Sequence, residues 1–288
     1  MQITIKKAGA FTTLQDHGRF MHGHLGMPVS GFMDAEAAHL ANKMVGNQPG
    51  QGLIEITWTG MSFDIDVDCS VAVAGAEFEC WVNNKQVQTN QVIHLKQGDC
   101  FKMGQLQQGV RGYLAVAGGF AVTAVAGSQS TLTVADLGGY QGRALQAGDQ
   151  LPLKQPHRVP DFNKPAWKKI QTPSILVVRA QPGPEISLFD PHTIKQAFGQ
   201  AYHLTNDCNR QGFRLNSEPL KYPENFNMQS SGLLPGSLQV TPDGQTILAM
   251  IDAQTTGGYP RILVINQDQL HKLAQARPEQ SIYFFVEV

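Results

Sequence analysis

The chain has 288 residues, of which 42% are hydrophobic and 16% are charged, and its net charge is −1 at pH 7. This length suits one large domain or two ordinary ones. The near-neutral balance lacks the basic patch that binding to nucleic acid or to an anionic membrane requires, so neither partner is expected. The 29 glycines favour a turn-rich, mainly β fold over a helical bundle.

The first seven residues alternate like a strand and contain no apolar signal core. The chain contains no run of 18 apolar residues of the kind that spans a membrane. Its four cysteines, at positions 69, 80, 100 and 208, form no Cys-x-x-Cys pair, so a zinc site is not expected. We expect a cytoplasmic protein with reduced, buried or inert thiols, and we assign no metal ligands.

Residues 1–151 are predicted to form a β-rich subdomain of short strands punctuated by turns. One helix interrupts it, with Asp34 as the N-cap and Gly46 as the C-terminal stop. Its buried face is predicted to carry Ala37, Leu40, Ala41, Met44 and Val45. The strands expected farther along span residues 66–74, 78–82, 92–95 and 111–117.

Residues 152–173 contain five prolines among lysines and glutamines and are predicted to be a connection. A second β-rich subdomain is expected over residues 174–288, beginning and ending with strands at 174–179 and 281–288. Two short helices are expected within it. Asp190 caps the first, which runs from Pro191 to Gly199, and the second spans about 268–276.

The clearest candidate for a ligand-binding loop follows the apolar run 247–251, which reads as a buried strand. Glycines in such a loop let the backbone take a positive φ and approach a ligand closely. The alternative is a tight Gly-Gly turn with incidental polar neighbours. The candidate site residues of this loop are Asp252, Gln254, Thr255, Gly257, Gly258 and Tyr259.

A second polar block covers residues 12–19, where Arg19 offers a planar fork for a carboxylate or phosphate. The alternative for Arg19 is an ion pair with Asp16 or Asp34. Asn42 borders the buried stripe of the predicted helix, where structural bonding is the safer interpretation.

Two glycine-rich loops, 127–131 and 138–143, carry hydroxyls or an arginine, and their backbone N–H groups can cradle an anion. Neither matches a Walker phosphate loop. The histidines at positions 17, 22 and 24 form a local cluster without an evident third metal ligand, so a polar loop is favoured over a metal site.

Several of these blocks occur together in one family. The patterns are Thr-Thr-x-Gln-Asp-x-Gly-Arg at 12–19, Pro-x-Ser-Gly-x-Met-Asp at 28–34, and Ala-Asn-x-x-Val-Gly-Asn at 41–47. The stretches 111–119, 127–131, 138–143 and 252–260 continue them in order. With these motifs the chain resembles the biotin-dependent carboxyltransferase-like family, also called allophanate hydrolase subunit 2, over nearly its whole length. Stand-alone members include 5-oxoprolinase subunits and the Kip operon antagonist protein.

The resemblance implies a cyclophilin-like β-barrel architecture, expected in two β-rich subdomains, and a separately encoded partner of the subunit 1 type. It implies a complex that uses ATP with Mg²⁺ to open the lactam of 5-oxoproline to L-glutamate. The alternatives are transfer of a carboxyl group from carboxybiotin, as in urea carboxylase relatives, and a non-catalytic regulatory protein like the Kip antagonist.

For such chemistry, cationic forks are expected to hold the phosphate or the substrate carboxylate. We assign catalytic roles to Asp252, Arg210 and Arg214, and substrate or ATP binding to the loop residues above together with Arg19, Asn42, Arg111 and Arg143. One motif departs from the family, which usually carries Ser-Asp-Arg-Met-Gly-x-Arg-Leu where this chain has Cys208 to Leu215. Asn209 replaces the aspartate, and if that aspartate orients Arg210 or acts as a base, activity is expected to be reduced or altered.

Overall fold

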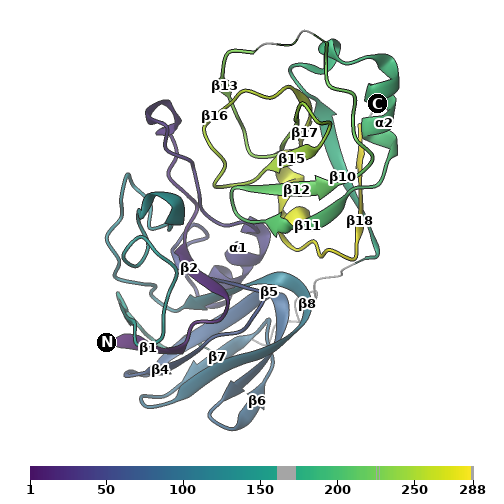
Figure 1. Ribbon diagram of the computed structural model, residues 1–288. Coiled ribbons are helices and arrows are strands. Elements are labelled where there is room, and N and C mark those ends of the chain that lie inside the picture. The colour runs from purple at the N-terminus through teal and green to yellow at the C-terminus, as the bar shows by residue number, and fades with distance from the viewer. Residues whose placement is uncertain (161–172, 225, 227, 287–288) are drawn as a thin grey trace. The chain divides into compact units, whose positions relative to one another are not determined.

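The computed structural model describes residues 1–160, 173–224, 226 and 228–286. The chain divides into two compact units, each built around a curled sheet (Figure 1). Unit 1 comprises Met1–Arg19 and Ser30–Thr172, and unit 2 comprises Phe20–Val29 and Pro173–Val288. The mainly β fold with a few short helices is confirmed. The predicted proline-rich connection lies mostly outside the described residues.

Unit 1 contains a nine-stranded sheet whose main path runs β2-β3-β8-β4-β1-β9, with β5 pairing with β6, β7 and β8. The strands are β1 Gln2–Lys7, β2 Phe11–Gln15, β3 Leu53–Thr57, β4 Ser62–Ile65, β5 Cys69–Val82, β6 Lys85–Val87, β7 Val92–Leu95, β8 Cys100–Val116 and β9 Gln150–Pro152. A short 3-10 helix, η2, spans Thr133–Ala135.

Strand β5 corrects one prediction, because the separate strands expected at 66–74 and 78–82 are parts of one 14-residue strand that begins at Cys69. The apparent break at Gly75 is a set of register irregularities against β8 rather than a turn. Gly75 has a φ of 86°, which residues that carry a side chain rarely adopt. Register irregularities of this kind are β-bulges, which bend a strand without ending it. The predicted strand 111–117 is likewise the last part of β8.

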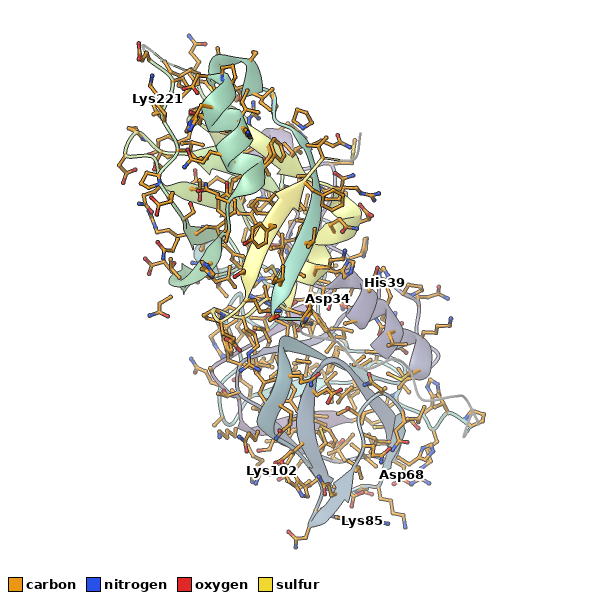
Figure 2. The ribbon with its side chains drawn as sticks, turned by 90° about the vertical axis from the view of Figure 1, so that its right-hand side faces the viewer. Asp34, His39, Asp68, Lys85, Lys102 and Lys221 are labelled. Atoms are coloured by element: carbon orange, nitrogen blue, oxygen red, sulfur yellow. The ribbon has the colours of Figure 1, made fainter. Side chains whose placement is uncertain are left out.

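Helix α1, Ala35–Met44, covers one face of β5 and β8. The side chain of Asp34, labelled at the start of this helix in Figure 2, accepts a hydrogen bond from the Ala37 backbone at 3.0 Å, so the predicted N-cap is confirmed. The helix packs through small residues, which allow a close approach to the sheet. These are Ala37, Ala38 and Ala41 on the helix and Ala72, Ala74 and Ala115 on the strands.

Unit 2 contains a seven-stranded sheet in the order β11-β12-β15-β14-β17-β10-β18, in which only the β10–β18 pair is parallel, and a separate two-stranded pair, β13–β16. The strands are β10 Ile175–Pro182, β11 His203–Cys208, β12 Gly212–Asn216, β13 Ser231–Gly232, β14 Ser237–Val240, β15 Thr246–Ala249, β16 Thr256–Gly257, β17 Arg261–Ile265 and β18 Ser281–Phe285. The last two residues of the strand predicted at 281–288 lie outside the described residues.

The helices of unit 2 are α2 Pro191–Gly199 and α3 Leu270–Ala274, with 3-10 turns η1 Gly23–Leu25, η3 Ile186–Leu188 and η4 Gln267–Gln269. Asp190 caps α2 as predicted, accepting from the Thr193 backbone at 2.8 Å. The helix expected at 268–276 is shorter, because its first turn is 3-10 and its end closes with a bond from Ala276 N to Leu273 O. No helix among the described residues is long and apolar enough to cross a membrane.

Candidate functional site

The polar motif at 12–19 forms an interlocked structure with the glycine loop 127–131. The Asp16 carboxylate accepts hydrogen bonds from the hydroxyls of Ser128 and Ser130 at 2.6 and 2.5 Å. It also accepts from the backbone N–H groups of Gln129 at 2.6 Å and Gly18 at 2.8 Å. The loop therefore does cradle an anion, as its composition predicts, but that anion is a side chain of the same chain.

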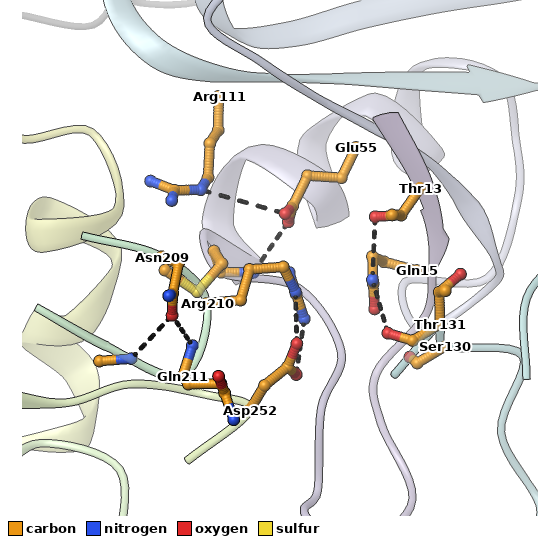
Figure 3. Close-up of polar contacts among 12 residues, drawn as sticks. Thr13, Gln15, Glu55, Arg111, Ser130, Thr131, Asn209, Arg210, Gln211 and Asp252 are labelled. Atoms are coloured by element: carbon orange, nitrogen blue, oxygen red, sulfur yellow. Dashed lines mark hydrogen bonds and ion pairs between the residues drawn. The ribbon is translucent and has the colours of Figure 1, made fainter. Parts of the chain in front are cut away.

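The neighbouring residues of both motifs tighten this junction. The Gln15 amide donates to the Thr13 hydroxyl at 3.0 Å and to the Thr131 carbonyl at 3.1 Å (Figure 3), and the Thr131 hydroxyl donates to the Leu14 carbonyl at 2.9 Å. A Cβ at Gly139 would lie 1.8 Å from the Thr131 hydroxyl oxygen. The glycine at position 139 therefore leaves room for Thr131. The two glycine-rich loops, 127–131 and 138–143, pack against each other within unit 1.

Two of the predicted site arginines are engaged within unit 1. Arg19 is 1% exposed, and its guanidinium donates to the Ser130 carbonyl, which fixes it against the loop 127–131. Arg143 forms a two-point ion pair with Asp149, at 2.7 and 2.8 Å. That hydrogen-bonded guanidinium lowers the pKa of the Asp149 carboxyl. Both arginines therefore stabilise loops of unit 1.

Arg111 belongs to a buried polar network that the sequence analysis does not predict. Its Nε lies 4.0 Å from a carboxylate oxygen of Glu55, which is 1% exposed (Figure 3). Glu55 also accepts from the Tyr113 hydroxyl at 2.9 Å and from the Met33 backbone at 3.0 Å. Burial, followed by the Glu55 charge, raises the pKa of Tyr113 well above its usual value. The sequence feature that could have indicated this network is the glutamate within the mostly apolar strand Leu53–Thr57, because a buried charge needs partners.

Asn42 is fully buried and is bonded within the structure that ends helix α1. Its amide nitrogen donates to the Pro49 and Gln51 carbonyls at 3.2 and 2.8 Å, and its oxygen accepts from the Asn47 amide at 3.1 Å. Asn47 in turn donates to the Val116 carbonyl at 2.9 Å. The motif at 41–47 therefore ties the helix end to the end of β8, in agreement with the structural interpretation of Asn42.

The candidate binding site is a pocket of about 470 Å³ in unit 2. Its floor is a row of directly paired residues across three strands, in which Arg214 of β12 faces Ile247 of β15 and Ile247 faces Gln239 of β14. The β13–β16 pair adds Gly257 to the lining. Five residues predicted for the site meet here: Arg214, Gln254, Gly257, Gly258 and Tyr259.

Pocket chemistry is dominated by amide groups. Asn209, Gln211, Gln239 and Gln254 can each donate and accept hydrogen bonds. Among the described lining residues, Arg214 is the one cation and Asp207 the one carboxylate. Apolar surface comes from Leu233, Ile247, Ala249 and Ala253. The pocket suits a small polar molecule that carries an anionic group and an amide.

Arg210 and Asp252 are chain neighbours of lining residues of this pocket and form a buried ion pair, 6% and 4% exposed. Arg210 Nε and Nη2 donate to the two Asp252 carboxylate oxygens at 2.7 and 3.0 Å (Figure 3). The Asp252 backbone also donates to the Arg210 carbonyl at 2.8 Å. The pair joins the turn after β11 to the loop after β15, so it positions two walls of the pocket.

A model of the family described as "Carboxyltransferase domain, subdomain A and B" matches residues 25–286. The chain belongs to this carboxyltransferase-domain family. It is 36% identical to the 5-oxoprolinase C subunit of Escherichia coli over 98% of this chain and 90% of that protein, and 34% identical to the Haemophilus influenzae counterpart over 94% and 87%. A crystal structure of the Kluyveromyces lactis urea amidolyase matches 100% of this chain and 19% of that chain, with TM-score 0.92 and 29% identity.

In this carboxyltransferase-domain chain, the departure at Asn209 is structurally mild. The Asn209 side-chain oxygen accepts from the backbone N–H groups of Gln211 at 2.8 Å and Gly212 at 3.3 Å. An aspartate oxygen accepts in the same way, so the amide preserves the turn. The Arg210 guanidinium is held by Asp252, so its orientation does not depend on a carboxylate at residue 209.

We expect Asn209→Asp to change the free energy of unfolding by less than about 0.5 kcal/mol, because the oxygen acceptor is retained. Asn209→Ala removes the acceptor of two N–H groups and is expected to cost about 1 kcal/mol. Differential scanning calorimetry on the two variants measures this difference. A large gain in activity from Asn209→Asp would instead show that the amide is a functional departure.

The conformational prediction for Gly257 and Gly258 is wrong, because neither glycine has a positive φ. A Cβ at Gly257 would lie 2.6 Å from Nε2 of Gln239, so a larger residue there would have to displace the end of that side chain. A Cβ at Gly258 would meet its nearest neighbour, the Ser230 hydroxyl, at 3.8 Å. Thr255 accepts from the Leu233 backbone through its carbonyl at 2.8 Å and does not line the pocket.

The sequence-based assignment misses the other lining residues, among them the polar side chains of Asp207, Asn209, Gln211 and Gln239. Gln239 is 6% exposed within the short strand Ser237–Val240, so a glutamine in a buried strand is the available signal. No sequence feature marks Asp207 as a pocket residue, because it is an exposed residue near the end of a strand.

The structure also bears on metal binding and on the thiols. Among the described residues, no group of three or more histidine, cysteine, aspartate or glutamate side chains is placed to hold a metal ion.

Burial raises the pKa values of Cys69 and Cys80 to about 12. Both thiols are therefore protonated and unreactive at neutral pH.

Proposed function

We propose that this chain is a subunit of an ATP-dependent 5-oxoprolinase complex, which opens 5-oxoproline to L-glutamate together with a subunit 1-like partner. The observation that carries the proposal is its 36% identity to the Escherichia coli 5-oxoprolinase C subunit over 98% of this chain and 90% of that protein. This coverage spans both units, including the one that holds the candidate pocket.

The pocket chemistry supports the substrate class. 5-Oxoproline has one carboxylate, a lactam N–H and a lactam carbonyl on a small apolar ring. The Arg214 guanidinium matches the carboxylate as a charged hydrogen-bond donor. The amides of Gln211 and Gln254 can pair with both polar atoms of the lactam, and Ile247 and Leu233 offer apolar contact for the ring.

The same residues fit Mg²⁺ and a nucleotide triphosphate poorly. One guanidinium does not balance a triphosphate, and one carboxylate, Asp207, is a sparse ligand set for Mg²⁺. Asp252, one of the predicted catalytic residues, has both carboxylate oxygens bonded to Arg210. We therefore assign this pocket to the lactam substrate rather than to ATP.

A carboxyl transfer is the second candidate function, favoured by 30% identity to the urea amidolyase of Lachancea kluyveri over 97% of this chain and 16% of that protein. That reaction would use urea and a carboxybiotin donor. The regulatory alternative rests on the asparagine at position 209, and the intact turn there argues only against a structural defect.

The decisive experiment combines this chain with its co-encoded partners, 5-oxoproline, ATP and Mg²⁺, and measures glutamate and ADP. We expect glutamate and ADP in equal amounts, and none when this chain is omitted. Urea with carboxybiotin in place of 5-oxoproline tests the second candidate. The proposal fails if the complete set of folded subunits produces no glutamate, or if omitting this chain leaves glutamate production unchanged.

A further inference from the structure

Unit 1 contains a second pocket, of about 560 Å³, that the proposed lactam chemistry does not use. It is formed by the loop after α1, the turn after β8 and the stretch at 154–157. Its lining includes the basic side chains of His17, Lys154 and His157, and no described lining residue carries a carboxylate. Positive and negative charges nearly balance over the whole chain, whose net charge is −1, so a lining with basic but no acidic side chains differs from that overall balance.

Backbone carbonyls orient both imidazoles. Nδ1 of His157 lies 2.9 Å from the Gln155 carbonyl, and Nδ1 of His17 lies 3.3 Å from the Gly50 carbonyl. A carbonyl can only accept, so Nδ1 is the donor nitrogen of each imidazole.

Nearby acidic groups are already satisfied. The Asp16 carboxylate, next to His17 in the chain, is 5% exposed and receives the four hydrogen bonds of the glycine loop junction. Asp68 lies 3.3 Å from Arg158, the residue after His157, and accepts from the Gln97 backbone. Neither carboxylate lines the pocket.

Gly118, which lines the pocket, and its neighbour Gly119 allow two segments of unit 1 to pack closely. Gly118 and Gly119 have φ of 87° and 76°, which disfavours any other residue. A Cβ at Gly118 would lie 2.0 Å from the Gln155 carbonyl oxygen, and one at Gly119 would lie 2.0 Å from Nε2 of Gln51. This close packing brings the stretch that carries Lys154 and His157 against the loop that carries the amides of Gln48 and Gln51.

We propose that this pocket of unit 1 binds a phosphate-type anion, either inorganic phosphate or the phosphate group of a nucleotide. Phosphate carries between one and two negative charges at neutral pH and accepts hydrogen bonds at several oxygens, which matches the Lys154 ammonium and the two glutamine amides, beside two imidazoles, better than a single carboxylate does. The inference does not depend on the lactam reaction.

Titration of the full chain with inorganic phosphate and with ATP, by isothermal calorimetry at low ionic strength, tests the proposal. We expect saturable binding, weakened about tenfold or more in the Lys154→Met/His157→Gln double variant. Lys85→Met, on the β5–β6 hairpin (Figure 2), is the matched control and should bind like the unmodified chain. Tighter binding of ATP than of phosphate identifies a nucleotide as the ligand, and equal binding identifies free phosphate.

Circular dichroism and thermal unfolding establish that the double variant is folded before its binding is compared. Absence of saturable binding of both probes to the unmodified chain at millimolar concentration would overturn the proposal. Binding that is unchanged in the folded double variant would also overturn it. Because no turnover is measured, these outcomes are independent of whether the chain acts on 5-oxoproline.

Discussion

Replacing Asp16 with alanine is expected to lower the free energy of unfolding of unit 1 by about 3 kcal/mol or more. The substitution removes the acceptor for Ser128, Ser130, Gln129 and Gly18, and each buried donor left without a partner costs about 1–3 kcal/mol. Such a loss is a large fraction of the roughly 5–15 kcal/mol that typically stabilises a domain. Urea denaturation followed by tryptophan fluorescence measures it.

Tryptophan fluorescence follows unit 1 selectively, because residues 20–29 and 173–288 contain no tryptophan, whereas Trp58 and Trp81 lie in unit 1. Asp16→Asn is expected to cost less, since one oxygen remains to accept while its NH₂ group faces the Gln129 N–H. Asp207→Ala, at an exposed carboxylate of unit 2, is the control and should leave this transition unchanged. A small effect of Asp16→Ala would show that the interlocked loops contribute little to stability.

The Asp16 junction illustrates what the sequence can predict and what it cannot. The composition of loop 127–131 correctly predicts an anion cradle, because serine hydroxyls and backbone N–H groups after a glycine are visible in a short motif. The anion that fills it lies more than 110 residues earlier in the chain. A single sequence contains the donors and the acceptor but not their pairing, so the motif alone points to an external ligand.

Local signals predict the helices of the fold well, since the caps Asp34 and Asp190 act within three residues. The predicted break between two strands at Gly75 is wrong, because a glycine permits a bulge as readily as a turn, and pairing with β8 decides between them. Contacts with residues farther along the sequence also decide which of the predicted site arginines are held in ion pairs and which line the pocket. Arg143 and Arg210 meet carboxylates, whereas Arg214 faces the pocket.

Arg214→Ala is expected to lower kcat/KM for 5-oxoproline by about 10- to 150-fold in the reconstituted complex. A hydrogen bond to a charged group contributes about 1.5–3 kcal/mol, which corresponds to this range. The fold should be preserved, because Arg214 is exposed on β12 while its neighbours Phe213 and Leu215 supply the core contacts. Arg214→Lys keeps the charge but loses the planar fork, so an intermediate loss is expected.

Arg277→Ala is the matched control, since it removes a guanidinium from unit 2 that is paired with Glu279 and does not line the pocket. Steady-state kinetics, with thermal unfolding of each variant, separates loss of substrate binding from loss of folded protein. If Arg214 binds the substrate carboxylate, its variants lose affinity while the melting temperature stays near that of the unmodified chain. Equal kcat/KM values for Arg214→Ala and Arg277→Ala would remove Arg214 from the site. The pocket row Arg214–Ile247–Gln239 would then be part of the sheet surface rather than a substrate floor.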